Sequence, residues 1–273
     1  MVSSSAWSAL GQRFTVSGGT PAADDSLALL LGGLDPSPAT EGDERFELTR
    51  AETVAIDTGL PVTDVLTGLV GSINHAALDG GEGNLLLHAA AVARPDGGCL
   101  VLCGASGSGK STLTAALVAG GLGYVTDETV CLDPVSLRIT PYRKPLSLKV
   151  GAQQHLPHLA PSAELPVPHE EGSAWLVAPS RLGPYPDPPE RLHPDLVVFL
   201  TWSTAHPPGV RDLTTGETAF LAGRNSSRLA VTKGGPLTAL ARLGHQVPGF
   251  RMHHHDSDSA AAAVHDLWSE VAR

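Results

Sequence analysis

The sequence is poor in aromatic residues, cysteine and long apolar runs, and each shortage narrows the class of protein. Only 4% of its 273 residues are Phe, Trp or Tyr, so Leu, Val and Ala must fill the core. Three cysteines cannot all pair, and a chain of this length needs no disulfides, which indicates a reducing compartment. No apolar run approaches the ~20 residues of a membrane-spanning helix, and the first residues do not resemble a secretory signal. We therefore expect a cytoplasmic protein without a membrane partner.

Basic residues are also scarce. The chain has 18 Lys and Arg against 28 Asp and Glu, a formal net charge of −10. Because binding DNA or RNA depends on neutralising backbone phosphates, a nucleic-acid partner is not expected. With 42% hydrophobic and 17% charged residues, the chain is too apolar to be disordered, and its length suits one large domain or two small ones.

The pattern along the chain predicts an α/β protein with a small N-terminal α+β region. Residues 1–60 contain two candidate strands, Arg13–Val16 and Arg45–Leu48, between turns. Apolar residues at helical spacing predict a helix over residues 62–78. We therefore expect a domain or arm over 1–60 and the main domain over 61–273.

Strands and helices alternate in the main domain. Ten of the 22 prolines lie between Pro157 and Pro194, which predicts a long irregular loop that could act as a lid. The remaining pattern predicts strands at 85–92, 99–103, 123–126 and 196–202, a hairpin at 129–140, and helices at 110–119, 235–244 and 256–273.

One glycine-rich segment, residues 104–111, reads Gly-Ala-Ser-Gly-Ser-Gly-Lys-Ser and satisfies the pattern G-x-x-x-x-G-K-[ST]. An apolar strand should enter it and a helix should leave it, as a phosphate-binding loop requires. Glycines let the backbone curl around a phosphate with N–H groups pointing inward, and the helix adds its own free N–H groups. Lys110, one of four lysines, can then reach the β- and γ-phosphates, and the hydroxyl of Ser111 can bind Mg²⁺.

An acid pair, Asp127 and Glu128, follows the strand at 123–126, only 17 positions after Lys110. One carboxylate can hold Mg²⁺ while the other accepts the proton of an attacking hydroxyl, and the sequence leaves open which does which. Alone, the pair would be typical of a solvated turn. Its closeness to the loop in the sequence favours a catalytic role. It also argues against a GTPase, in which a switch region would lie between the loop and such an acid.

Three segments together resemble the catalytic core of the HPr kinase/phosphorylase family. They are His88-Ala-Ala-Ala-Val, then Leu-Val-Leu-Cys-Gly-Ala-Ser-Gly-Ser-Gly-Lys-Ser-Thr, then Gly-Tyr-Val-Thr-Asp-Glu. The chain is most similar to the small HPr kinase-like enzymes that phosphorylate serine in lasso-peptide precursors or similar substrates. The resemblance covers residues 85–150 and is weak before residue 60. It implies a phosphate-loop kinase core of the HPr kinase/phosphoenolpyruvate carboxykinase type.

The resemblance also implies roles for individual residues. His88, Lys110, Asp127 and Glu128 would be catalytic, with Ser111, Asp127 and Glu128 around the Mg²⁺ ion. Without the family, His88 in an apolar strand would be typical of a core histidine. The nucleotide-binding loop would comprise Gly104, Ala105, Ser106, Gly107, Ser108, Gly109, Lys110, Ser111 and Thr112.

The sequence departs from the bifunctional members of the family at Glu128, where they have a second Asp, and at Thr112, where many have Glu. Their Arg-Gly-Leu-Gly stretch does not occur. We therefore expect a one-way, ATP- and Mg²⁺-dependent kinase acting on a serine of a peptide or protein, with a homo-oligomer left open. The alternatives are a kinase of free serine or another metabolite, and a regulatory protein that binds ATP without transfer.

Other residue groups carry weaker hypotheses. Of the three consecutive histidines, only His253 and His255 could share a metal ion on a strand, and no further ligand pattern accompanies them. The cysteines are more typical of small buried residues than of a redox site. Two basic pairs remain: Arg143 and Lys144 could be surface charges or lie near phosphate, and Arg224 and Arg228 have no assigned role.

Overall fold

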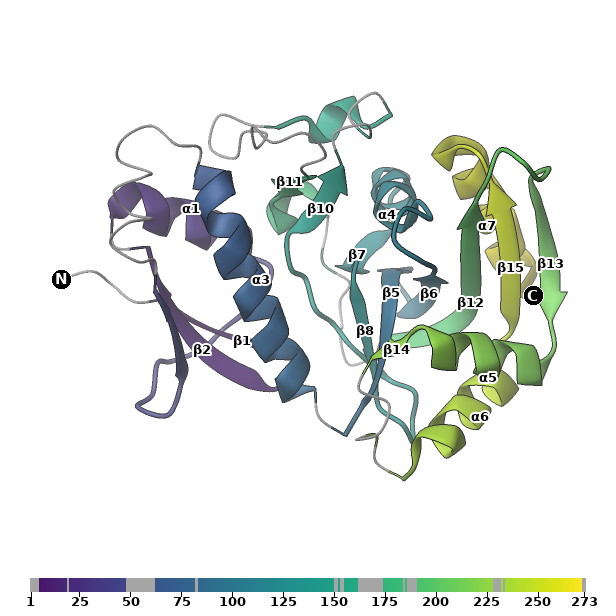
Figure 1. Ribbon diagram of the computed structural model, residues 1–273, viewed down its shortest axis with the longest axis horizontal. Coiled ribbons are helices and arrows are strands. Elements are labelled where there is room, and N and C mark those ends of the chain that lie inside the picture. The colour runs from purple at the N-terminus through teal and green to yellow at the C-terminus, as the bar shows by residue number, and fades with distance from the viewer. Residues whose placement is uncertain are drawn as a thin grey trace. The chain divides into compact units, whose positions relative to one another are not determined.

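The computed structural model describes residues 5–18, 20–47, 62–81, 83–149, 152, 155–161, 174–183, 185, 191–227, 232 and 234–271. These residues form a mixed α/β protein, as the sequence predicts (Figure 1). They group into two compact units, residues 1–81 with 143–181 and residues 82–142 with 182–273. The boundary expected after residue 60 stays a prediction. No helix within the described ranges is long and apolar enough to cross a bilayer.

The first unit contains a four-stranded sheet in the order β3-β1-β2-β4. A hairpin joins β1 to β2, and β4 pairs parallel to β2. Two helices accompany this sheet, and a separate antiparallel pair, β10 and β11, completes the unit. The elements are β1 (Ser5–Ala9), β2 (Gln12–Ser17), α1 (Pro21–Leu31), β3 (Asp35–Pro36), β4 (Glu44–Glu47), α3 (Val62–Gly80), β10 (Leu146–Lys149), β11 (Ala174–Val177) and the short 3-10 turns Pro157–Leu159 and Pro179–Arg181.

The second unit is built on a mixed sheet in the order β13-β15-β12-β6-β5-β8-β9. Strand β12 runs parallel to both β6 and β15, whereas β5 runs antiparallel to β6. The strands are β5 (Leu85–Ala93), β6 (Gly98–Cys103), β7 (Gly123–Thr126), β8 (Thr129–Leu132), β9 (Ile139–Thr140), β12 (His193–Trp202), β13 (Gly209–Leu213), β14 (Ser226–Ser227) and β15 (Gly249–His254). The helices are α4 (Lys110–Ala119), α5 (Thr215–Arg224), α6 (Pro236–Gln246) and α7 (Ser257–Val271).

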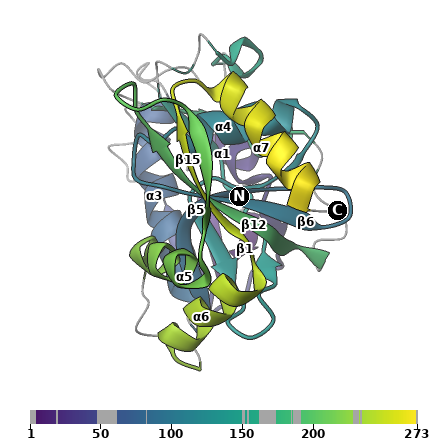
Figure 2. The same ribbon diagram turned by 90° about the vertical axis from the view of Figure 1, so that its right-hand side faces the viewer.

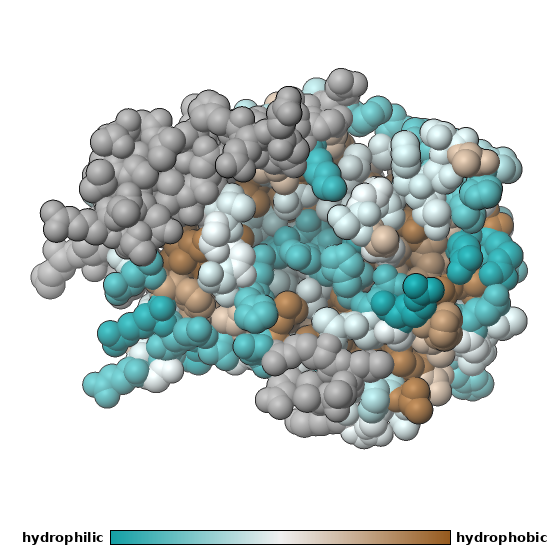
Figure 3. Space-filling model, in the orientation of Figure 1, coloured by the Kyte–Doolittle hydropathy of each residue, from teal (hydrophilic) through white to brown (hydrophobic). Residues whose placement is uncertain are grey.

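Helices cover both faces of this sheet. Helix α4 packs against α7 on one face and α5 packs against α6 on the other (Figure 2). Because side chains alternate along a strand, Val101 and Cys103 of β6 contribute to the core under α6, with Leu240 and Leu243. Among the residues coloured in Figure 3, most of those on the side drawn are hydrophilic or intermediate, with apolar residues in small groups. A sheet buried on both faces explains why β5 and β6 are almost wholly apolar in sequence.

Most elements predicted from the sequence are confirmed. The structure has the strands at 85–93, 98–103, 123–126 and 193–202, the 129–140 hairpin and the predicted helices within a few residues. The expectation of an irregular loop over 157–194 is wrong for the described residues 174–177, which form β11 on β10. The sequence reading also missed α1 and α5.

A polar contact anchors the C-terminal helix to the sheet. Asp195 Oδ2 in β12 accepts hydrogen bonds from Arg94 Nη2 at 2.7 Å and from Trp268 Nε1 of α7 at 2.8 Å. The guanidinium of Arg94 stacks over the Trp268 ring at 4.3 Å. The carboxylate therefore satisfies the N–H of a buried indole and an ion pair at once.

We expect Asp195→Ala to lower the free energy of unfolding by about 2–3 kcal/mol, because it leaves the Trp268 N–H and the Arg94 guanidinium without their acceptor. Urea unfolding followed by circular dichroism measures the change. The exposed Asp212 in β13 provides the control, since Asp212→Ala should change stability by less than about 0.5 kcal/mol. Equal effects of the two substitutions would show that the anchor contributes nothing.

Candidate phosphate-binding site

The segment from Gly104 to Gly109 joins the end of β6 to the first residue of α4, as the motif predicts. β6 lies inside the sheet between β5 and β12, and its described side chains are all buried. The loop therefore begins at the carboxyl end of a central, buried strand. The carboxyl ends of strands are where α/β proteins bind ligands. The N–H groups of the first turn of α4 have no partners within the helix and can bind an anion.

Two glycines of the loop occupy positions that another residue would not fit. Gly109 has φ +88°, and a Cβ there would lie 2.8 Å from Cε1 of His254. A Cβ on Gly104 would lie 2.5 Å from the Ser108 hydroxyl. That hydroxyl is buried and has no hydrogen-bond partner among the described residues. The loop thus requires glycine for steric reasons, and it holds an unpaired buried polar atom.

Lys110 folds back over the start of its own loop. Its Nζ donates to Gly104 O at 2.6 Å and to Ala105 O at 3.2 Å, and lies 3.3 Å from Nε2 of His88. These three acceptors match the three hydrogens of an ammonium group. Burial lowers the pKa of Lys110 from its ordinary value, while Cys103 and then Asp127 and Glu128 act in the opposite direction. The structure thus brings the expected phosphate-binding cation and the expected catalytic histidine together.

His88 is the only exposed residue of β5. The reading of this residue as a buried core histidine is therefore wrong. Since an ammonium group only donates, Nε2 of His88 must accept, so the ring is neutral with its proton on Nδ1. Loss of hydration and the charge of Lys110 lower the pKa of His88 from its ordinary value, against smaller opposite effects of Glu128 and Asp127.

The acid pair lies between β7 and β8, and its two members have different surroundings. Asp127 is 4% exposed, and its Oδ1 accepts from Tyr124 Oη at 3.1 Å while Oδ2 accepts from Ser111 Oγ at 3.4 Å. Glu128 is exposed. The pKa of Tyr142 is raised by burial and by the charges of both carboxylates. Asp127 is thus fixed against the hydroxyl of Ser111, and Glu128 faces solvent.

The oxygen atoms gathered here suit magnesium. Mg²⁺ takes oxygen ligands and is commonly held by one or two carboxylates together with nucleotide phosphates. Ser111 and Asp127 offer a hydroxyl and a carboxylate side by side, and Glu128 is the neighbouring residue. Within the described residues no three His, Cys, Asp or Glu side chains gather as a metal site.

Two residues of the site escaped the sequence reading. His254, at the end of β15, is buried, and its Nε2 lies 2.9 Å from the carbonyl oxygen of Ser108 in the loop. Tyr124, buried in β7, orients Asp127 through its hydroxyl. The alternation of β7 could have indicated that Tyr124 shares a side with Thr126. Nothing in the histidine run distinguishes His254 from its neighbours, because its contact is with a loop 146 residues away.

Two further hypotheses concern a basic pair and the cysteines. Arg143 and Lys144 are buried in the first unit, where they donate to Pro179 O and Pro145 O, both at 3.1 Å. Cys99, Cys103 and Cys131 are free and buried, and burial raises the pKa of each thiol, that of Cys103 to about 12. Burial and a raised pKa both disfavour the reactive thiolate, which accords with the expectation of small buried residues.

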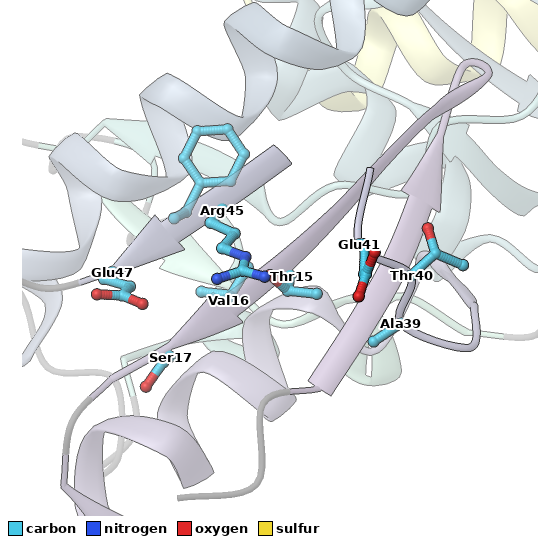
Figure 4. A pocket seen from close by; sticks show the side chains of 9 residues that line it. Thr15, Val16, Ser17, Ala39, Thr40, Glu41, Arg45 and Glu47 are labelled. Atoms are coloured by element: carbon cyan, nitrogen blue, oxygen red, sulfur yellow. The ribbon is translucent and has the colours of Figure 1, made fainter. Parts of the chain in front are cut away.

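The first unit has a cavity of its own, of about 380 Å³, beside β2 and β4. Arg45 projects into it between Glu41 and Glu47 (Figure 4). Among the described residues that line this cavity, two carboxylates therefore outnumber one guanidinium, which does not favour a phosphate.

No protein-family model matches the chain, and no curated protein matches it significantly. The assignment of a function therefore rests on the geometry around Lys110 and Asp127.

We expect His254→Ala to loosen the phosphate loop, because the imidazole packs under Gly109 and bonds to Ser108. Hydrogen exchange measured by mass spectrometry should become about tenfold faster for peptides covering residues 104–110, as expected from the loss of one hydrogen bond. His255→Ala, one position along the chain, is the control and should leave exchange unchanged. Unchanged exchange in the His254 variant would show that this contact does not hold the loop.

We expect His88 to titrate below its ordinary pKa of 6.5, because partial loss of hydration of its ring and the charge of Lys110 both oppose its protonation. Nitrogen-15 NMR of the imidazole measures this, and it should report a neutral ring protonated on Nδ1 at pH 7. Lys110→Met should raise the His88 pKa, whereas Arg138→Met, at an exposed position beyond the end of β8 that is remote from His88, should not. A wild-type pKa at or above 6.5 would contradict the observed contact.

Proposed function

We propose that this chain is an ATP- and Mg²⁺-dependent kinase that transfers the γ-phosphoryl group to a serine hydroxyl of a peptide or protein. The observation that carries the proposal is the grouping of Lys110, His88, Ser111 and Asp127 around one glycine-rich loop at the edge of a sheet. Sequence resemblance to the HPr kinase-like enzymes supports the same reaction and a core of the HPr kinase/phosphoenolpyruvate carboxykinase type. The proposed reaction requires ATP, and the three cysteines are free thiols. Both features accord with a cytoplasmic location.

The loop and Lys110 would bind the triphosphate. Backbone N–H groups of residues 104–111 and the start of α4 provide donors, and Lys110 exchanges its contacts with Gly104 O and Ala105 O for phosphate oxygens. Such positioning of the transferred group accounts for much of the rate of phosphoryl-transfer enzymes. The neutral His88 keeps Lys110 at this end of the loop and adds no charge that would repel it.

The acid pair would divide the remaining work. Asp127, held by Tyr124 beside Ser111, is placed to ligate Mg²⁺, which when bound neutralises charge on the β- and γ-phosphates. Glu128, exposed beside it, is placed to accept the proton of the serine hydroxyl. The serine oxygen forms a bond to the γ-phosphorus as the bond from that phosphorus to the β–γ bridging oxygen breaks. The products are phosphoserine and ADP, with the proton on Glu128.

We expect Lys110→Ala to weaken binding of a fluorescent ATP analogue by about 10- to 100-fold, the effect of losing charged hydrogen bonds. Asp127→Asn should retain nucleotide binding by the loop and Lys110, and should lose transfer of label from γ-labelled ATP to serine-containing peptides by at least about 100-fold, because the carboxylate placed to hold Mg²⁺ is removed. Arg138→Ala and Asp212→Asn, at exposed positions of the second unit outside the site, serve as controls. Full transfer by the Asp127→Asn protein would overturn the mechanism. ATP binding without labelled peptide or labelled phosphate would instead indicate a regulatory nucleotide-binding protein.

A further inference from the structure

A second cavity, of about 500 Å³, adjoins the start of the phosphate loop in the second unit. One side is formed by His88 and the first loop residues, Gly104 and Ala105, which are the groups that contact Lys110. The other side is formed by the end of α5 and by β15, including Arg224 and Arg251. The lysine of a phosphate-binding loop reaches the β- and γ-phosphates. In the proposed kinase, this cavity would therefore lie beside the γ-phosphoryl group that is transferred.

The pairing of the sheet places Arg251 on the side of α5. Arg251 pairs with Phe199 of β12, and Phe199 pairs with Cys103 of β6. Residues in one row across a sheet point to the same face, and Phe199 and Cys103 belong to the core under α5 and α6. Arg251 therefore points to the face that α5 covers.

Arg224 is the last residue of α5, at an end where helix carbonyls would normally repel an anion. Here those carbonyls are occupied. Asn225 Nδ2 donates to Leu221 O at 2.8 Å, and Ser226 Oγ donates to Ala222 O at 2.9 Å. These two carbonyls therefore bond to the side chains that follow the helix, and Arg224 lies on the cavity wall beside them.

Neither guanidinium of this cavity forms an ion pair or a hydrogen bond with any residue that the structure describes. In contrast, Arg13, Arg94 and Arg211 each pair with a carboxylate. None of the described residues that line the cavity is an Asp or a Glu. In a chain with a net charge of −10, two unpaired guanidinium groups beside a phosphate loop provide a local site for an anion.

We propose that this cavity binds an anionic group of the acceptor, so that the substrate carries a carboxylate near the hydroxyl that is phosphorylated. This inference rests on the proposed kinase function and specifies the acceptor class. Arg224 and Arg251 bind the carboxylate, because a planar guanidinium can donate two parallel hydrogen bonds to it. Bound there, the acceptor presents its hydroxyl at the end of the loop marked by His88 and Lys110.

Malonate binding tests the cavity without requiring transfer. Isothermal titration calorimetry is run with the protein saturated with Mg²⁺ and the non-hydrolysable analogue AMP-PNP, so that the phosphate loop is filled. We expect the wild type to bind malonate, and Arg251→Gln and Arg224→Gln each to weaken binding at least about tenfold, as loss of a charged hydrogen bond implies. Arg138→Gln, which removes an exposed arginine outside the cavity, should leave malonate binding unchanged.

Several outcomes would overturn the inference. Malonate binding that is unaffected by Arg251→Gln excludes the cavity as its site. Competition between AMP-PNP and malonate shows that the anion occupies the phosphate loop. Failure of AMP-PNP to bind at all refutes the kinase proposal, and the acceptor role falls with it.

Transfer from γ-labelled ATP distinguishes the two sources of a carboxylate. Free L-serine is compared with L-serinamide, and a peptide with serine between two aspartates is compared with its asparagine counterpart. We expect kcat/KM to be at least about tenfold higher for the acidic member of one pair, and the preference to disappear in Arg251→Gln. A preference in the first pair identifies a small hydroxy acid, and one in the second pair an acidic peptide. Equal rates within both pairs contradict the proposal.

Discussion

The parallel pairing of β6, β12 and β15 is the constraint on which the site depends. Parallel strands end at the same edge of a sheet, so the phosphate loop after β6 and His254 at the end of β15 lie beside each other. Strand β5 runs in the opposite direction, and its Ala89 pairs with Cys103, the last residue of β6 before the loop. His88, the neighbour of Ala89, therefore lies at the same edge of the sheet. A loop held by buried strands on one side and by α4 on the other keeps its shape, which is what binding a phosphate requires.

The loop of residues 104–109 has basic side chains on one side and a buried carboxylate on the other. Lys110 is held over the first loop carbonyls, on the side of His88 and the cavity with Arg224 and Arg251. The hydroxyl of Tyr124 holds Asp127 beside Ser111, the residue that follows Lys110 in the chain. In the proposed kinase, the cations would bind the nucleotide and an anionic acceptor, and the oxygen atoms would bind the metal. The net charge of −10 therefore describes the chain as a whole and not this group of residues.

Local patterns predicted much of the second unit because they are strong there. Apolar strands bounded by glycines and the helix after Lys110 need no knowledge of distant residues. α5 was missed because Gly216 and Gly223 weaken its helical pattern and Phe220 is exposed. Its start was nevertheless signalled by Thr214 and Glu217, which form a capping box in the structure. The strand β11 was missed because prolines surround it and its partner β10 lies 25 or more positions earlier.

The sequence by itself determined the α/β class, the strand–loop–helix around Lys110 and the closeness of the acid pair, since each depends on residues near one another in the chain. Only the tertiary structure decided that His88 faces Lys110 instead of the core, that His254 supports the loop, and that Arg224 and Arg251 share a cavity. Those relations depend on strand pairing and on which face of the sheet each side chain occupies. The sequence of one strand determines neither its partner nor the face that each side chain occupies, because the same alternation fits either face until the sheet is assembled.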